Sequence, residues 1–244
     1  MAGVDDAALL ARRIVDVMDL SQARYGDEFF YQSLSLCALD AVFSIGVRWQ
    51  AVRNVVARYC AHTSTQVFRP LGSAAAPRSE QESISQFCAR LAGWGSPDQI
   101  AAMLGSRQRT STGGASILKA EATLRFAEQL RGHGIEHLQD MAALSLEQEA
   151  QVLGAIRAIP GQASGISWAA FRMLSGDEDQ VKPDRMVSRF ILAALGRAVS
   201  PEAAVELVRG AAVILRGTYP ELTPRLLDAQ IWKYQSGLSR AASS

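Results

Sequence analysis

The chain has 244 residues, of which 48% are hydrophobic and 20% charged, and its formal net charge is +1. These values are typical of a globular protein that can bury a core, and they exclude a chain that binds nucleic acid through a large overall excess of positive charge. No run of about 18 apolar residues is present and the first twenty residues include Asp5, Asp6 and Asp16, so we expect a cytoplasmic protein without a membrane span or signal peptide.

Apolar residues recur at helical spacing along the chain, and no segment alternates with the period of a strand. The pattern predicts an all-α protein of about ten helices, and a Pro-, Gly- and Ser-rich stretch at 69–79 predicts a linker or surface loop. We expect helices up to residue 21, at 29–39, 47–60, 79–91, from 97, and at 116–131, 145–158, 165–174, 183–195, 201–216 and 223–237.

Two of these helices have clear start signals. Ser96 followed by Pro97 is typical of an N-cap with proline in the first turn. Ser145 and Gln148 have the spacing of a capping box.

Residues 159–166 predict a tight turn between two helices. Pro160 fixes φ and Gly161 permits a sharp reversal of the chain. The backbone amides of 164–166 would then lie at a helix N-terminus, where unpaired N–H groups and the helix dipole attract an anion such as a DNA phosphate.

An isolated acid, Asp184, follows this turn at the start of the next helix. Pro183 suits a first helical turn, which would direct Asp184 away from the helix body. A simple first-turn acid that stabilises its helix is the alternative interpretation.

The stretch from Ile159 to Arg189 resembles the helix-hairpin-helix–Gly/Pro/Asp (HhH-GPD) superfamily of DNA glycosylases, in its endonuclease-III-like group. Ile159-Pro160-Gly161 matches the first half of the family hairpin, and Asp184 and Arg189 match the catalytic aspartate and a following basic residue. Two departures are Ala163, in place of the second hairpin glycine, and Gly165, near the position where bifunctional members carry their lyase lysine. The likeness extends, less specifically, over residues 30–195.

The resemblance implies two helical lobes with a base pocket between them. Residues 30–195 would form the lobe with the hairpin and the catalytic aspartate, and residues 1–29 plus 196–244 would form the second lobe. The activity implied is hydrolysis of the N-glycosidic bond of a damaged or mismatched base in double-stranded DNA, by a monomer, without lyase chemistry. A carboxylate such as that of Asp184 can stabilise the positive charge that develops on the sugar, or activate water.

The resemblance also assigns the binding residues. The hairpin carbonyls would accept a monovalent cation that bridges to the phosphate, and no other cofactor is required. The residues expected to contact DNA are Gly161, Ala163, Ser164, Gly165, Arg185 and Arg189. The weaker candidates for the base pocket or the wedge are Gln32, Asp40, Arg48, Trp168 and Asp228.

Flipping a base out of a duplex also requires apolar surfaces that sandwich it. The aromatic candidates are Trp168, Phe171, Trp49, Phe43 and Trp232, and we expect at least three of these to be core residues instead.

The cysteines, histidines and lysines exclude several other chemistries. No cysteine follows Cys88, so we expect no iron–sulfur cluster. His133 and His137 have a zinc-ligand spacing but lack a third ligand, so no metal site is expected. Lys119, which could be only a surface residue, and Lys182 are poor candidates for a lyase nucleophile.

Two alternatives remain. The chain could be a helix-hairpin-helix DNA-binding module that has lost catalysis, because Ala163, Gly165 and the near-neutral charge all depart from an active enzyme. It could also be a helical interaction protein unrelated to nucleic acid. A basic surface at the hairpin would favour the enzyme, and acids around the hairpin would favour the alternatives.

Overall fold

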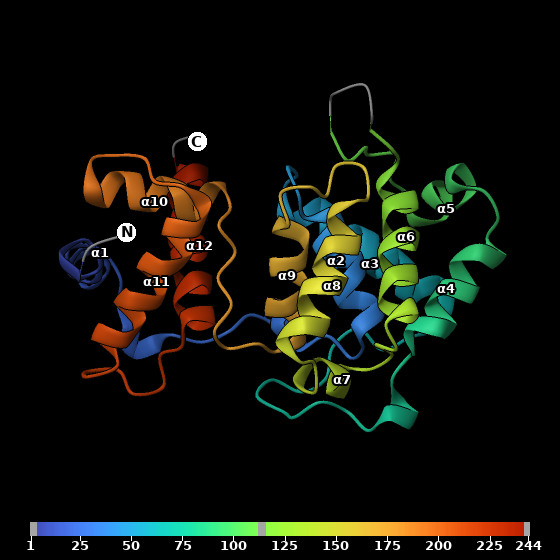
Figure 1. The fold of residues 1–244 in the computed structure, drawn as a ribbon, viewed down its shortest axis with the longest axis horizontal. Coiled ribbons are helices and arrows are strands. Elements are labelled where there is room, and N and C mark those ends of the chain that lie inside the picture. The colour runs from blue at the N-terminus through green and yellow to red at the C-terminus, as the bar shows by residue number, and fades with distance from the viewer. Residues whose placement is uncertain (1–3, 112–115, 242–244) are drawn as a thin grey trace. The chain divides into compact units, whose positions relative to one another are not determined.

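The computed structural model describes residues 4–111 and 116–241, apart from the side chains of 239–241 (Figure 1). The Gly-rich residues 113–115, which precede the helix predicted at 116–131, lie outside the described residues. The described chain is all-helical, as predicted, with two isolated β-bridges. None of its helices is both long and apolar enough to cross a membrane.

The helices follow one another in this order: α1 (Val4–Val17), η1 (Leu20–Gln22), η2 (Asp27–Phe30), α2 (Leu34–Phe43), α3 (Trp49–Thr63), η3 (Arg78–Glu80), α4 (Ile84–Gly93), α5 (Pro97–Leu104), α6 (Lys119–Gly132), α7 (Leu138–Ala142), α8 (Leu146–Arg157), α9 (Ile166–Ser175), α10 (Arg185–Leu195), α11 (Pro201–Leu215) and α12 (Pro224–Ala241).

Both predicted start signals are confirmed. Ser96 N-caps α5 with Pro97 in the first turn, and Ser145 and Gln148 form the capping box of α8. The helix predicted from residue 79 was wrong at its start, because α4 begins only at Ile84. Ser83 caps it instead, by accepting the N–H of Gln86 at 3.1 Å.

The chain forms two compact units, each with its own core. Unit 2 comprises residues 27–176. At its centre is α2, all of whose residues are buried, packed against α3, α6 and α9. The apolar sequence of α2 explains this position, because a helix that is apolar all round must be covered on every side.

Unit 1 comprises residues 1–26 and 177–244, and in it α1, α10, α11 and α12 pack together. The division at residue 177 differs from the lobe boundary predicted at 195. The cause is the apolar face of α10: Val187, Phe190 and Ile191 are buried, and the Phe190 ring meets Tyr234 of α12 edge-on at 5.8 Å. Asp184 therefore belongs to the unit of the terminal helices, and the predicted hairpin to unit 2.

Candidate functional site

The turn between α8 and α9 lies where the sequence predicts it. The N–H of Gln162 donates to the Ile159 carbonyl at 2.9 Å, with Pro160 and Gly161 between them. Gly161 has φ +82°, the left-handed conformation that the third position of a type II turn requires. A second reversal follows at Gly165, which has φ +73° and N-caps α9.

This turn exposes backbone donors. Ala163 and Ser164 are exposed, and their N–H groups form no hydrogen bond with the described residues. The Ile166 N–H has only a long bond, 3.4 Å, to the Ser164 hydroxyl. Unpaired amides at the start of a ten-residue helix are the arrangement that attracts an anion.

Arg157, in the last turn of α8, lies against the turn. A Cβ placed on Gly165 would be 3.0 Å from the Arg157 Nε atom, so the guanidinium is at the entrance to α9. Arg157 is exposed and pairs with no acid among the described residues. Arg157 was not predicted as a site residue, although its place two residues before the predicted turn was a usable signal.

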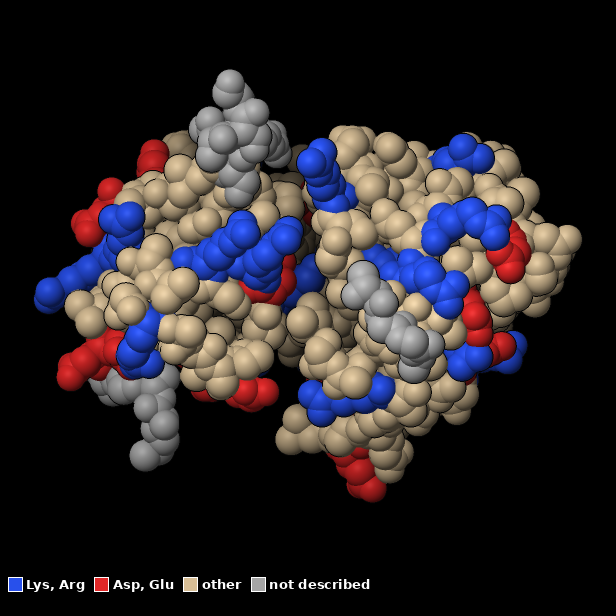
Figure 2. Space-filling model, turned by 90° about the horizontal axis from the view of Figure 1, so that it is seen from above, with Lys and Arg blue, Asp and Glu red and all other residues tan. Residues whose placement is uncertain are grey.

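A segment distant in the sequence also contacts the turn. Thr110 touches Gly161, since a Cβ on that glycine would be 2.4 Å from the Thr110 Cβ. The preceding residue, Arg109, donates from Nε to the Ser116 hydroxyl at 2.8 Å. Figure 2 views unit 2, in its right half, from the side of the α8–α9 turn: Lys and Arg side chains are spread over this side, and Asp and Glu occupy less of it.

Asp184 is the N-cap of α10. Its Oδ1 atom accepts the N–H groups of Met186 at 2.7 Å and Val187 at 3.2 Å, so the carboxylate folds back over the first turn and does not point away from the helix. The predicted first-turn position of Pro183 was therefore wrong, because the aspartate cap starts the helix at Arg185. Asp184 is partly exposed, and its Oδ2 atom accepts no hydrogen bond from the described residues.

A second carboxyl group lies near Asp184 in unit 1. Asp228 of α12 is only 4% exposed, and its Oδ1 accepts the Lys182 N–H at 3.0 Å. Burial, followed by the negative charge of Asp184, raises the pKa of Asp228 well above its ordinary value. Asp228, predicted as a weak pocket residue, is thus brought close to the predicted catalytic aspartate.

The other two predicted DNA contacts, Arg185 and Arg189, lie on the exposed side of α10 in the same unit as Asp184. Neither pairs with an acid among the described residues. Both guanidinium groups are therefore available to an external anion.

The remaining pocket candidates have mainly structural contacts. Asp40 is buried and accepts the Tyr31 hydroxyl at 2.7 Å, and Arg48 is exposed at the N-cap of α3. Trp168 packs its ring 5.5 Å from that of Phe171 in the core of unit 2. With Phe43 also buried, at least three of the five aromatic candidates are core residues, which confirms the expectation.

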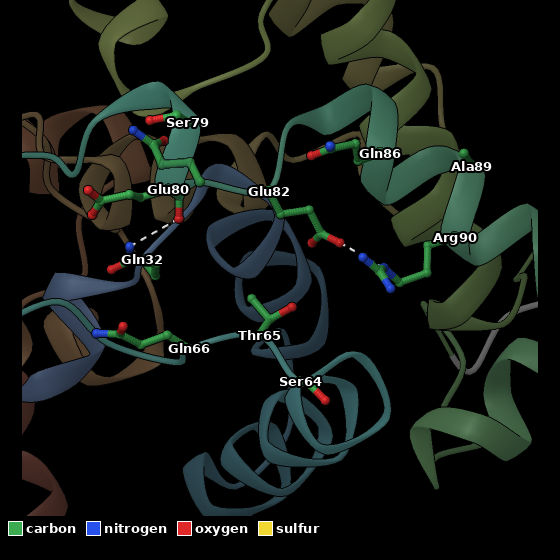
Figure 3. Close-up of a pocket in the computed structure, with 11 residues that line it drawn as sticks. Gln32, Ser64, Thr65, Gln66, Ser79, Glu80, Glu82, Gln86, Ala89 and Arg90 are labelled. Atoms are coloured by element: carbon green, nitrogen blue, oxygen red, sulfur yellow. Dashed lines mark hydrogen bonds and ion pairs between the residues drawn. The ribbon is translucent and has the colours of Figure 1, made fainter.

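Gln32 borders a polar cavity of about 490 Å³ in unit 2 (Figure 3). Its Nε2 donates to the Glu80 carbonyl at 3.2 Å. Across the cavity Glu82 accepts the Arg90 Nε at 2.8 Å and the Tyr59 hydroxyl at 2.7 Å. These polar groups therefore already have hydrogen-bond partners within the protein, so they do not mark the cavity as a binding site.

Lys119 is not a surface residue, because it is only 2% exposed. Its Nζ donates to the carbonyls of Phe43, at 2.9 Å, and Ile45, at 2.6 Å, where α2 ends. An ammonium group at this position satisfies the last carbonyls of a helix and complements its dipole. Lys119 therefore caps the C-terminal end of α2.

The histidines have structural positions as well. His133 C-caps α6 and His137 N-caps α7. In the described part of the chain no three His, Cys, Asp or Glu side chains are grouped so that they could hold a metal ion.

Comparisons with known proteins give one match. A family model described as "Domain of unknown function (DUF8548)" matches residues 9–236. No curated protein and no solved structure matches the chain. Because the family model covers nearly all of the sequence, the chain belongs to the DUF8548 family.

Proposed function

We propose that this protein is a monofunctional DNA glycosylase that releases a damaged or mismatched base from double-stranded DNA. The observation that carries the proposal is the state of Asp184. One carboxylate oxygen is fixed by two backbone N–H groups, while the other is unoccupied on a partly exposed residue. A carboxylate held in this way can act on an external positive charge without first rearranging.

The chemistry requires one carboxylate. As the bond between C1′ and the base nitrogen breaks, positive charge develops on the deoxyribose, and Asp184 would stabilise it. A water oxygen then bonds to C1′, one proton of that water passes to the carboxylate or solvent, and the base leaves with a proton. The strand is left intact with an abasic site.

The α8–α9 turn would bind the backbone of the duplex. Its free amides at Ala163 and Ser164 and the unpaired guanidinium of Arg157 are donors that suit a phosphate. The resemblance to the HhH-GPD superfamily adds a monovalent cation at the turn carbonyls as a further proposal. A monomer bound to a duplex with a damaged base is the proposed complex.

Strand cleavage is not part of the proposal. Gly165 stands near the position where bifunctional relatives carry their lysine, and the ammonium of Lys119 donates to two carbonyls. An imine between enzyme and sugar therefore has no obvious nucleophile. Trapping of a covalent protein–DNA adduct by borohydride would contradict this part of the proposal.

The test is a panel of duplexes, each with one damaged or mismatched base, scored for base release with and without alkali. We expect strand breaks only after alkali, and a rate lowered on the order of 100-fold or more by Asp184→Asn. Asparagine is as good an N-cap as aspartate, so this variant keeps the helix start and removes only the charge.

The matched control is Asp19→Asn, which also changes an aspartate N-cap in unit 1, at η1. It should leave base release unchanged. Wild-type rates in the Asp184→Asn protein would refute the assignment.

A DNA-binding module without catalysis is the second candidate. The observation that favours it is the turn itself, where Ala163 replaces a glycine and Thr110 covers one side of Gly161. Duplex binding with no base release from any member of the panel would support this alternative.

A further inference from the structure

Asp228 and Asp184 are linked through one residue of backbone. Lys182 donates its N–H to the Asp228 Oδ1 at 3.0 Å and accepts the Asp184 N–H at its carbonyl at 2.6 Å. Pro183 stands between the two and fixes one of the intervening dihedral angles. The orientation of the Asp184 side chain therefore depends on the position in which the Lys182 backbone is held.

Burial of the Asp228 carboxyl group costs free energy. The residue is 4% exposed, and a carboxyl group loses much of its hydration when buried. The charged groups that act on it are Asp184, which raises its pKa, and Lys182, which lowers it. The hydrogen bond from the Lys182 N–H offsets part of this cost, and it ties Asp228 of α12 to the segment that precedes Asp184.

We propose that Asp228 is a positioning residue for Asp184: its buried carboxyl group anchors the Lys182 backbone and so fixes how Asp184 is presented to the substrate. This inference rests on the proposed function of Asp184. The Asp228 carboxyl group itself is buried beneath the segment and does not contact the substrate.

Asp228 is biased toward its neutral form. Burial and the negative charge of Asp184 both raise its pKa, so the protonated form is favoured. A neutral carboxyl group still accepts the Lys182 N–H, so the anchor does not require a charge on Asp228.

Two variants separate the anchor from the charge. Asp228→Asn keeps an acceptor for the Lys182 N–H, whereas Asp228→Leu has a similar size and no acceptor. We expect Asp228→Leu to lower kcat by on the order of 10- to 100-fold at unchanged KM, because a small misplacement of a reacting group is sufficient for such a loss. Asp228→Asn should keep kcat within a few-fold of the wild-type value, because the acceptor for the Lys182 N–H remains.

A readout without activity keeps this inference distinct from the proposed function. Hydrogen exchange of the Lys182 amide should be slow in the wild type and in Asp228→Asn, and faster in Asp228→Leu. Carbon NMR of the carboxyl groups should show a lower pKa for Asp228 in Asp184→Asn, because the neighbouring charge is gone.

The outcomes decide between the two claims. If no duplex is a substrate but the amide and NMR results hold, the proposed function fails and the anchor stands. If Asp228→Leu keeps wild-type kcat and wild-type protection of the Lys182 amide, the inference is overturned. Should Asp228→Leu not fold, the wild-type protein decides: a Lys182 amide that exchanges as fast as an exposed, unbonded amide also overturns the inference.

Discussion

Substitution of Gly161 by alanine tests the geometry of the α8–α9 turn. Gly161 has φ +82°, where residues with a Cβ are disfavoured, and it also lies against Thr110. An added Cβ would be 2.4 Å from the Thr110 Cβ, 2.5 Å from its Oγ1 and 3.2 Å from its backbone carbonyl carbon. Two separate penalties are therefore expected at this one position.

The two penalties can be estimated separately. A left-handed conformation costs an alanine about 1–2 kcal/mol relative to glycine. Inserting a methyl group into a space already filled costs a further ~1–3 kcal/mol, because the Thr110 Cβ is next to the backbone and cannot swing aside as a long side chain can. The sum, about 2–5 kcal/mol, is a large part of the ~5–15 kcal/mol that stabilises a typical protein.

Two other glycines of unit 2 provide matched controls. Gly134 has φ +74° and nothing within 4 Å of an added Cβ, so Gly134→Ala should incur only the conformational penalty. Gly154 lies in α8 with open space around it, so Gly154→Ala should stabilise the helix by about 0.5–1 kcal/mol. Urea unfolding followed by circular dichroism measures all three.

The expected order of stability is Gly154→Ala, wild type, Gly134→Ala and last Gly161→Ala. If Gly161→Ala is no less stable than Gly134→Ala, Thr110 does not pack on the turn and the close approach is wrong. If both variants equal the wild type, the left-handed turn itself is refuted.

Three further predictions concern unit 2. Arg157→Ala should reduce the slope of the logarithm of the duplex-binding constant against the logarithm of salt concentration by about 1. Arg131→Ala, at the far end of α6, should leave this slope unchanged. Equal slopes for the wild type and Arg157→Ala would exclude Arg157 as a phosphate contact. Lys119→Met should lower the free energy of unfolding by about 2–4 kcal/mol, because two carbonyls lose their donor. A more stable variant would show that burying the ammonium costs more free energy than its hydrogen bonds contribute. Burial raises the pKa of Cys60 to about 12 and of Cys88 to about 11. Iodoacetamide at pH 8.5 should therefore label these thiols only after unfolding, as detected by mass spectrometry. Labelling of the native protein would contradict their burial.

Local patterns in the sequence predicted the parts of the fold that depend on neighbouring residues. Helical periodicity gave the all-α class, and Ser96 and Ser145 marked helix starts correctly. The Pro160-Gly161 turn was likewise predictable from two residues. Each of these features depends on hydrogen bonds between residues no more than four positions apart, so a short stretch of sequence contains all of its causes.

Some local signals competed, and the sequence alone did not show which of them starts the helix. Pro183 and Asp184 both suit the start of a helix, and the side-chain bonds from Asp184 to the first-turn amides decided in favour of the aspartate. Ser79 and Ser83 competed in the same way, and the reciprocal bonds between Ser83 and Gln86 decided the start of α4.

The sequence by itself therefore determined the all-α class, most of the helices, the turn and the choice of Asp184 as the residue to test. Only the tertiary structure decided which groups surround them. Lys119 caps a helix that ends 76 residues earlier, and Asp228 holds a backbone amide 46 residues away. Such contacts arise because packing of apolar faces brings distant segments together, and no pattern within either segment records its partner.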